Sequence, residues 1–373
     1  MKAWLEVLRI SNLPTVWTNL VAGTCVAGAF ADVSLEGPIG GWKLAVVLVA
    51  GSMLYLGGMV LNDVFDLDID RRERPERPIP SGRVPATVAA TVGWGLVVVG
   101  AILPWSISIA TGVVAVVVAG LVLLYDRIHA ATAWSVVVMA GCRVGLYLMA
   151  GAMVMSEVQQ DAFRITRPDL EGPLVALLIA IPVFIHVASF SLVARFEVPT
   201  SEETCPSCGH PVLGDQATCP ECGEASDVAT RHERAEATLG RRRTWGGTGT
   251  LALLLPFAAC CGLATFVLGI GNSGAEPSEV FRVLGLSFAI LVVLGIFLLN
   301  TTRDLARRPR AVGRFVVRSI AAMSLYDTAL VGMMILRAVD AAPAQVGAAF
   351  FATIACLACF VLVCWAHRRI PGT

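Results

Sequence analysis

The sequence predicts an all-α integral membrane helical bundle of about 9–10 transmembrane helices with a small cytoplasmic insert. Of its 373 residues, 56% are hydrophobic and only 15% are charged, whereas soluble domains carry about 25% charged residues. Apolar runs of about 20 residues recur along the chain, as expected for transmembrane helices. The net charge is zero, so bulk charge says nothing about nucleic acid, and no nucleic-acid partner is expected.

Ten apolar runs are each long enough to cross a hydrocarbon core of about 30 Å. Arg9 interrupts the first apolar stretch, which continues into a full span and so does not resemble a cleavable signal peptide. Pro104 and Trp105 form the only break between the third and fourth runs, which predicts a tight helical hairpin. The runs cover residues 13–31, 43–62, 84–103, 105–124, 132–153, 173–194, 249–270, 281–300, 315–337 and 344–366.

The arginines predict the orientation of the bundle. Most of them lie in the segments 63–83, 125–131, 195–248 and 301–314 or at the two ends of the chain. Loops rich in Lys and Arg stay on the cytoplasmic side of a membrane. The expected protein therefore sits in the cytoplasmic membrane with its N-terminus and its charged loops in the cytoplasm.

An acidic motif ends the second run. Asn62, Asp66 and Asp70 are spaced four residues apart, and Asp63 precedes Asp66 by three, so an unbroken helix would present all four on one face. Two like charges about 4 Å apart repel by about 4 kcal/mol at an effective dielectric constant near 20. Mg²⁺ relieves such repulsion, since it binds carboxylates together with phosphate and water. The motif therefore predicts a magnesium site.

A basic and proline-rich segment follows the acidic motif directly. Its guanidinium groups are planar donors suited to phosphate oxygens. Carboxylate-bound Mg²⁺ beside such a cluster is typical of a diphosphate site, whereas the alternative is a solvated cap that only sets topology. The arginines are Arg71, Arg72, Arg74, Arg77 and Arg83.

The sequence N62-D-V-F-D66-L-D-I-D70 followed by RPIPSGRV resembles the first aspartate-rich motif of the UbiA-type intramembrane prenyltransferases. The segment RISNLPTVWTN resembles the first span of that family, in which a polar residue, here Asn19, faces the cavity. Tyr125 to His129 occupies the place of the family's Tyr-x-x-x-Lys motif. The resemblance covers most of residues 8–340 in the order of the spans.

This resemblance implies an enzyme that alkylates a lipophilic acceptor in the membrane. A prenyl diphosphate would be held through Mg²⁺ at the cytoplasmic face, with its isoprenoid tail in the membrane core. Loss of diphosphate would create an allylic, carbocation-like centre that the acceptor attacks. The residues implied as magnesium ligands or catalytic groups are Asn62, Asp63, Asp66 and Asp70, and those implied as substrate contacts include Asn19, Arg77, Arg83, Tyr125 and His129.

Two positions depart from the family pattern. The family's second motif, Asp-x-x-x-Asp after the sixth span, is replaced by SLVARFEVPTSEE. Glu197 is the expected acidic ligand there and Arg195 the expected diphosphate partner, and whether a second Mg²⁺ binds is left open. His129 replaces the family's lysine, so Arg127 is expected to supply a permanent positive charge.

Charged groups inside spans are expensive and tend to mark function. Arg143 and Asp327 are predicted to contact the substrates, with structural pairing between helices as the alternative. His186 is expected to be a satisfied core histidine. Arg318 and Asp327 are nine residues apart, so each is expected to have its partner on another helix.

The long loop after the sixth span contains two Cys-x-x-Cys knuckles. Four thiolates arranged in this way make a closed tetrahedral site, so the sequence predicts structural Zn²⁺ in a small zinc ribbon. Disulfides are disfavoured in the cytoplasm, and a rubredoxin-like iron site is the minor alternative. His210 is not expected to be a ligand. The zinc ligands would be Cys205, Cys208, Cys219 and Cys222.

The predicted organisation is a first part of the bundle over residues 1–200, the zinc-ribbon insert over 201–226 and a second part over 227–373. Besides the donor and acceptor, the expected partners are membrane lipid and a protein that docks on the ribbon. Two alternatives stay open. One is an isoprenoid-diphosphate-binding protein of the same fold that acts as a cyclase or a carrier. The other is a secondary transporter, which the surface position of the acidic motif disfavours.

Overall fold

The computed structural model describes most of the predicted bundle and only short pieces of the insert. The described residues are 2–31, 39–129, 132–158, 171–195, 203–204, 211–212, 222–223, 277–307, 312–339 and 343–369. Three of the four predicted zinc ligands therefore lie outside the described residues, as does Glu197. The predicted seventh span, 249–270, lies outside them as well.

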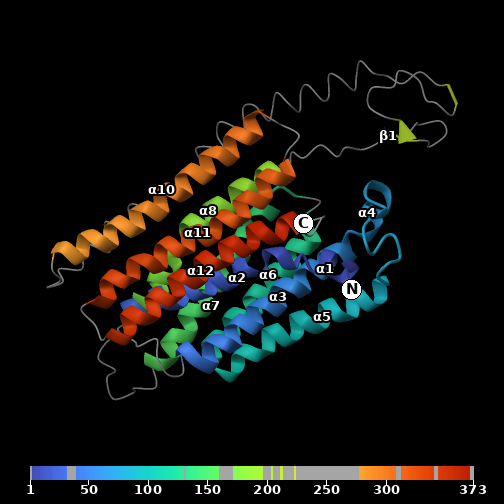
Figure 1. Ribbon diagram of the computed structural model, residues 1–373. Coiled ribbons are helices and arrows are strands. Elements are labelled where there is room, and N and C mark those ends of the chain that lie inside the picture. Colours follow the sequence, from blue (N-terminus) through green and yellow to red (C-terminus); the bar gives the residue numbers. More distant parts are fainter. Residues whose placement is uncertain are drawn as a thin grey trace.

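Long helices account for nearly all of the described chain (Figure 1). Short helical turns η1, η2 and η3 precede or join some of them, and two strands of two residues each are the only described β-structure. The elements are α1 (Lys2–Val7), η1 (Ile10–Asn12), α2 (Leu13–Phe30), η2 (Ile39–Lys43), α3 (Leu44–Phe65), α4 (Leu67–Glu73), α5 (Ala86–Ile102), η3 (Leu103–Ser106), α6 (Ile109–Ile128), α7 (Ser135–Val158), α8 (Glu171–Ala194), β1 (Glu203–Thr204), β2 (Pro211–Val212), α10 (Pro277–Arg307), α11 (Val312–Val339) and α12 (Pro343–Arg369).

Eight helices among the described residues are long and apolar enough to cross a membrane. They coincide with eight of the ten predicted runs, and the predicted run 281–300 lies within α10. The prediction of an integral membrane helical bundle is therefore confirmed. The expected hairpin after the third run is also present, with η3 turning the chain and the Ser108 side chain accepting a hydrogen bond from the Thr111 backbone N–H at 3.1 Å.

The helices α2 and α11 form the centre of the bundle, and both pack against α8 and α12. In each, 78% of the most apolar window is buried, against 22% in the windows of α5 and α12. The outer helices instead expose large apolar side chains such as Ile109 and Phe351, as expected of a surface that faces lipid. Polar side chains carried by α2 and α11 are thus enclosed by protein.

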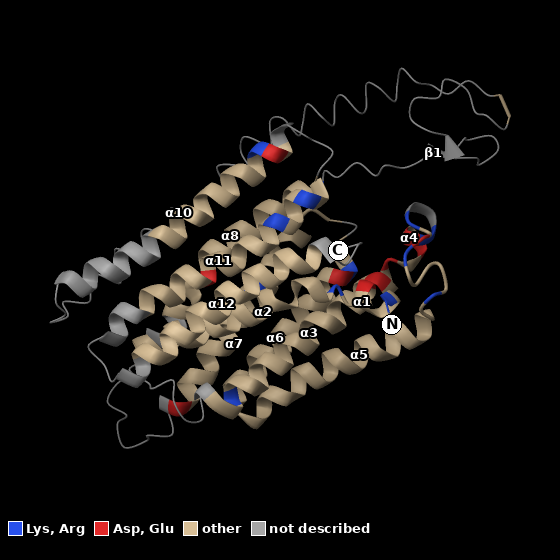
Figure 2. Cartoon of the chain, viewed as in Figure 1, with Lys and Arg blue, Asp and Glu red and all other residues tan. Residues whose placement is uncertain are grey.

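A change of direction follows α3. Asp66 lies between α3 and α4 with φ −83° and ψ 0°, and α4 projects beyond the end of the bundle (Figure 1). The predicted unbroken helix through Asp70 is thus interrupted, although helical hydrogen bonds continue on both sides of Asp66. Charged residues gather at this end of the bundle (Figure 2).

Candidate active site

A cavity of about 440 Å³ opens at the charged end of the bundle and runs inward between α2, α3, α6, α7, α8 and α11. The ends of α3, α6, α7 and α8 bring polar side chains to its mouth. The lining then continues inward with apolar side chains. Leu54, Val118 and Leu146 lie at least eight residues from the polar residue at the mouth end of their own helix, which is roughly 12 Å or more at 1.5 Å per residue. The cavity therefore has a charged mouth above an apolar interior.

The acidic motif divides into two pairs of side chains. Asn62 and Asp66 line the cavity, whereas Asp63 and Asp70 are buried beside it. Asp63 Oδ1 lies 2.9 Å from Arg9 Nη2, and Asp70 Oδ2 lies 2.8 Å from Arg77 Nη1. Arg77 Nη1 is also 3.6 Å from Asp63 Oδ1. Cationic side chains thus offset the repulsion that the sequence predicts between these carboxylates.

His129 joins the end of α6 to the acidic motif. Its Nε2 lies 2.9 Å from Asp66 Oδ2 and its Nδ1 lies 3.1 Å from the backbone oxygen of Asp126. Both nitrogens can donate to these oxygens only in the doubly protonated ring. The hydrogen bond with Asp66 raises the pKa of His129 against the opposing effect of burial. Both contacts and the direction of the pKa shift favour the protonated imidazole.

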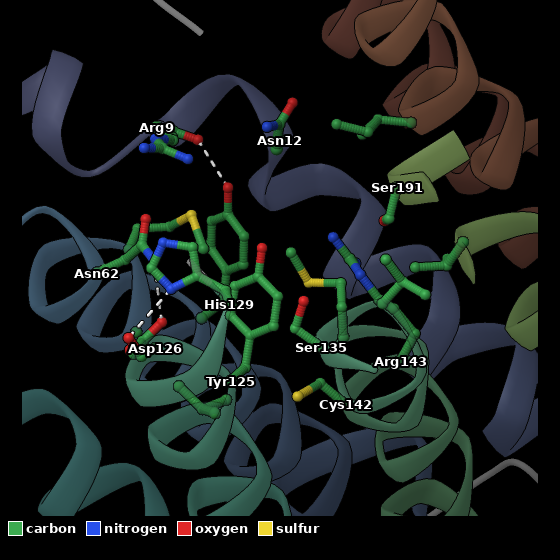
Figure 3. Close-up of a pocket in the computed structure, with 18 of the residues that line it drawn as sticks. Arg9, Asn12, Asn62, Tyr125, Asp126, His129, Ser135, Cys142, Arg143 and Ser191 are labelled. Atoms are coloured by element: carbon green, nitrogen blue, oxygen red, sulfur yellow. Dashed lines mark hydrogen bonds between the residues drawn. The ribbon is translucent and has the colours of Figure 1, made fainter. Parts of the chain in front are cut away.

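The aromatic ring of Tyr125 stacks on His129, with ring centroids 5.3 Å apart, and also lines the cavity. Beside it, Asp126 is only 3% exposed. Asn62 Nδ2 donates to Asp126 Oδ1 at 3.3 Å, so this contact links α3 to α6. Asp126 was not among the site residues predicted from the sequence, although an acidic residue directly after the motif's tyrosine was a usable signal. Figure 3 shows Asn62, Asp126 and His129 together on one side of the cavity.

Arg9 was likewise not selected from the sequence, because it lies before the first predicted span. It is the only non-glycine residue with a positive φ among the described residues, at 44°. L-residues adopt this conformation at a cost of about 1–2 kcal/mol. The Tyr55 hydroxyl donates to the Arg9 carbonyl at 3.1 Å, and both residues line the cavity. This contact helps to fix the turn that aims Arg9 at Asp63.

The other predicted arginines lie in different places around the mouth. Arg195 lines the cavity and donates through Nη1 to the His129 carbonyl at 2.6 Å and to Ser135 Oγ at 2.9 Å. Arg83 pairs with Glu6 at 3.2 Å and is not part of the cavity lining. Arg127 is exposed and is also outside the lining.

A second polar cluster lies deeper, between α2, α7 and α11. Asp327 is fully buried and accepts from Asn19 Nδ2 at 2.8 Å and from the Tyr147 hydroxyl. The side-chain oxygen of Asn19 in turn accepts from Arg143 Nη1 at 3.2 Å, and Thr15 Oγ1 accepts from the same nitrogen at 3.0 Å. Arg143 lines the cavity on the side opposite Asp126 (Figure 3).

The remaining charged or ionisable groups inside spans have structural contacts. His186 Nε2 lies 2.8 Å from the Ser319 carbonyl, which agrees with a satisfied core histidine. Arg318 pairs with Asp304 of α10 at 3.2 Å, and Asp327 has its partners on α2 and α7. Arg318 and Asp327 thus each have a partner on another helix, as predicted.

The mouth suits a hard divalent cation. No three His, Cys, Asp or Glu side chains in the described part of the chain are already grouped in a metal-binding arrangement. Mg²⁺ needs fewer protein ligands, because it keeps waters and binds one or two carboxylates plus phosphate oxygens. Asn62, Asp66 and Asp126 offer such oxygens in the cavity, and Asp126 Oδ2 has no hydrogen-bond partner among the described residues.

Comparison with known proteins agrees with this arrangement. Residues 20–198 match the UbiA prenyltransferase family. A digeranylgeranylglyceryl phosphate synthase of Ignicoccus hospitalis is 33% identical over 127 residues, 34% of this chain and 39% of that protein. The protein of the same name from Methanopyrus kandleri is 39% identical over 100 residues, 27% of this chain and 34% of that protein. The matches thus span well under half the length of these relatives.

Among solved structures with a similar fold is one of an archaeal protein. It is the apo structure of a UbiA homolog from Aeropyrum pernix K1, with a TM-score of 0.52 and 15% sequence identity. The similarity covers 85% of this chain and 96% of that one. At this identity it supports the shared fold alone.

Proposed function

Because residues 20–198 of the chain match the UbiA prenyltransferase family, we propose that it is a member of this family and transfers a prenyl group from a prenyl diphosphate to a lipophilic acceptor in the membrane. One observation carries the proposal: the cavity combines a cationic and acidic mouth with an apolar interior. That division matches a donor with a charged diphosphate head and an isoprenoid tail. The curated relatives, which are named digeranylgeranylglyceryl phosphate synthases, support the same class of reaction.

The residues at the mouth have distinct roles in this proposal. Arg74, Arg77 and His129 face the diphosphate, and Asn62 and Asp66 would hold Mg²⁺. The bound ion would neutralise charge that develops on the departing diphosphate. The bond between the prenyl carbon and oxygen breaks with its electrons on diphosphate, the acceptor forms the new bond, and the acceptor loses a proton. The ring of Tyr125 beside the mouth can stabilise the allylic cation.

Arg143 supplies the acceptor contact in the same scheme. Its guanidinium lies deeper than the mouth and has no carboxylate partner within ion-pair distance among the described residues. Thr15 and Asn19 occupy only one of its nitrogens. The free donors therefore suit a polar or anionic group on the acceptor.

Purified protein tests the proposal directly. Incubated with radiolabelled prenyl diphosphates, membrane lipid extract and Mg²⁺, it is expected to form a labelled lipid, and EDTA is expected to abolish the product. Bound or cyclised donor without transfer would favour a carrier or a cyclase over a transferase. Failure to bind any prenyl diphosphate would contradict the proposal as a whole.

We also propose that the charged end of the bundle faces the cytoplasm, because arginines such as Arg74, Arg77 and Arg195 lie there. Arg195, at the end of α8 where the chain enters the insert, lines the mouth. In this orientation, soluble prenyl diphosphate reaches the mouth from the cytoplasm, while the acceptor stays in the bilayer.

The insert is proposed to be a zinc ribbon that binds structural Zn²⁺ through Cys205, Cys208, Cys219 and Cys222. In support, β1 and β2 pair antiparallel on either side of the first knuckle. Gly223, directly after the last cysteine, has a φ of 74°, the left-handed conformation that a turn of this kind requires. A ribbon this small depends on its metal to fold and would brace the mouth or dock a protein partner.

Metal analysis is expected to find about one Zn²⁺ per purified chain. Changing Cys205 and Cys208 together to serine should remove the zinc, because two thiolates cannot close a tetrahedral shell. Cys359→Ser, within α12, should retain it and serves as the control. Iron in place of zinc, or a cysteine pair that migrates as a disulfide without reductant, would contradict the assignment.

A further inference from the structure

Asp126 is a buried carboxylate that lacks the pairing of its neighbours. At the same mouth, Asp63 pairs with Arg9, Asp66 with His129 and Asp70 with Arg77, each within 2.9 Å. No ion pair of this kind involves Asp126 in the described part of the chain. Its Oδ2 also has no hydrogen-bond partner among the described residues, although the residue is only 3% exposed.

The nearby cations are already engaged. His129 points Nε2 at Asp66 and Nδ1 at the backbone oxygen of Asp126, so neither nitrogen is left for the Asp126 carboxylate. An uncompensated buried carboxylate costs several kcal/mol. Retaining one beside a cavity points to a positive ligand that binds there.

The surrounding oxygens define the class of that ligand. Asn62 and Asp66 are one helical turn apart on the same face of the chain, and both line the cavity. The Asn62 amide, on α3, donates to Asp126 Oδ1 on α6 at 3.3 Å. The carboxylates of Asp66 and Asp126 therefore lie on either side of the Asn62 amide at the edge of the cavity. Such a set of hard oxygens is typical of a divalent cation that shares its shell with phosphate and water.

We propose that Asp126 is the second carboxylate ligand of the diphosphate-bound divalent cation, in the role that the sequence analysis assigned to Glu197. The inference rests on the proposed function, because the diphosphate completes the metal shell. It gives the chain an acidic ligand on α6 and removes the need for an aspartate pair after α8.

Binding of Mn²⁺ tests the assignment without measuring turnover. Full-length protein in detergent would be titrated with Mn²⁺ in the presence of inorganic pyrophosphate, and free Mn²⁺ would be followed by electron paramagnetic resonance. Asp126→Asn is expected to weaken Mn²⁺ binding by at least about tenfold. Glu197→Gln and Asp68→Asn, the latter exposed on α4, should stay within about twofold of the unmodified chain.

Thermal unfolding without metal separates a ligand from a structural residue. Asp126→Asn should unfold at the same or a higher temperature than the unmodified chain, because the change removes an uncompensated charge. A large drop would indicate a structural role and overturn the inference.

The outcomes also separate this inference from the proposed function. Equal Mn²⁺ affinity of Asp126→Asn and the unmodified chain would overturn the inference and leave the proposed function in place. If only Glu197→Gln lost Mn²⁺ binding, Glu197 would be the metal ligand, and the inference about Asp126 would be overturned while the proposed function stayed in place. No Mn²⁺ binding by the unmodified chain with pyrophosphate would instead overturn the magnesium-dependent function itself.

Discussion

Asp66→Ala is expected to lower the rate of prenyl transfer by about 10²- to 10³-fold. Asp66 is the one carboxylate of the acidic motif in the cavity lining, and it also holds the charged ring of His129. Its removal takes away a metal ligand and releases a diphosphate contact together. A loss of several kcal/mol of charge stabilisation corresponds to a rate change of this size. The measurement is turnover with saturating donor and acceptor.

Two further variants separate the roles of Asp66. Asp66→Asn retains an oxygen for His129 but loses the negative charge, so a large loss here assigns the effect to the metal. Asp68→Asn is the matched control, because Asp68 lies on the exposed face of α4, where it pairs with Arg71. If Asp66→Asn retained full activity while Asp66→Ala did not, the carboxylate would act only by orienting His129.

The sequence predicted the bundle well because hydropathy is a property of each segment taken alone. Eight helices of sufficient length coincide with predicted runs, and the hairpin at Pro104 follows from local chain chemistry. The prediction that the acidic motif presents one face to its surroundings was less accurate, because it assumed that the helix continues unbroken through Asp70. The irregular residue at Asp66 and the arginines that pair with Asp63 and Asp70 decide which carboxylates face the cavity.

Contacts between helices limit how many of the site residues can be predicted from the sequence. Asn62, Tyr125, His129 and Arg195 could be selected because each belongs to a local motif, and all of them line the cavity. Arg9, Tyr55 and Asp126 could not be ranked in this way. Their importance comes from neighbours 46–64 residues away in the chain, a relation that spacing within one helix does not encode.

Asp327→Ala is expected to destabilise the bundle by about 2–4 kcal/mol. The carboxyl accepts hydrogen bonds from Asn19 and Tyr147, and all three residues are fully buried. Removing it leaves two donors that have lost a partner, each at a cost of about 1–3 kcal/mol, and the lower half of that range is typical within membranes. Unfolding of the purified protein in mixed micelles measures the difference.

The same substitution should affect the acceptor more than the donor. Asn19 connects Asp327 to Arg143, so a displaced Asn19 leaves Thr15 as the remaining described hydrogen-bond partner of that guanidinium. Because Arg143 lies below the mouth, the KM for the acceptor is expected to rise while the KM for the diphosphate donor changes little. Asp327→Asn retains an acceptor oxygen and should lose less stability. Asp304→Ala, which breaks a partly exposed pair with Arg318, should cost under about 1 kcal/mol. If Asp327→Ala raised both KM values equally, the deep cluster would support the whole bundle rather than orient Arg143 toward the acceptor.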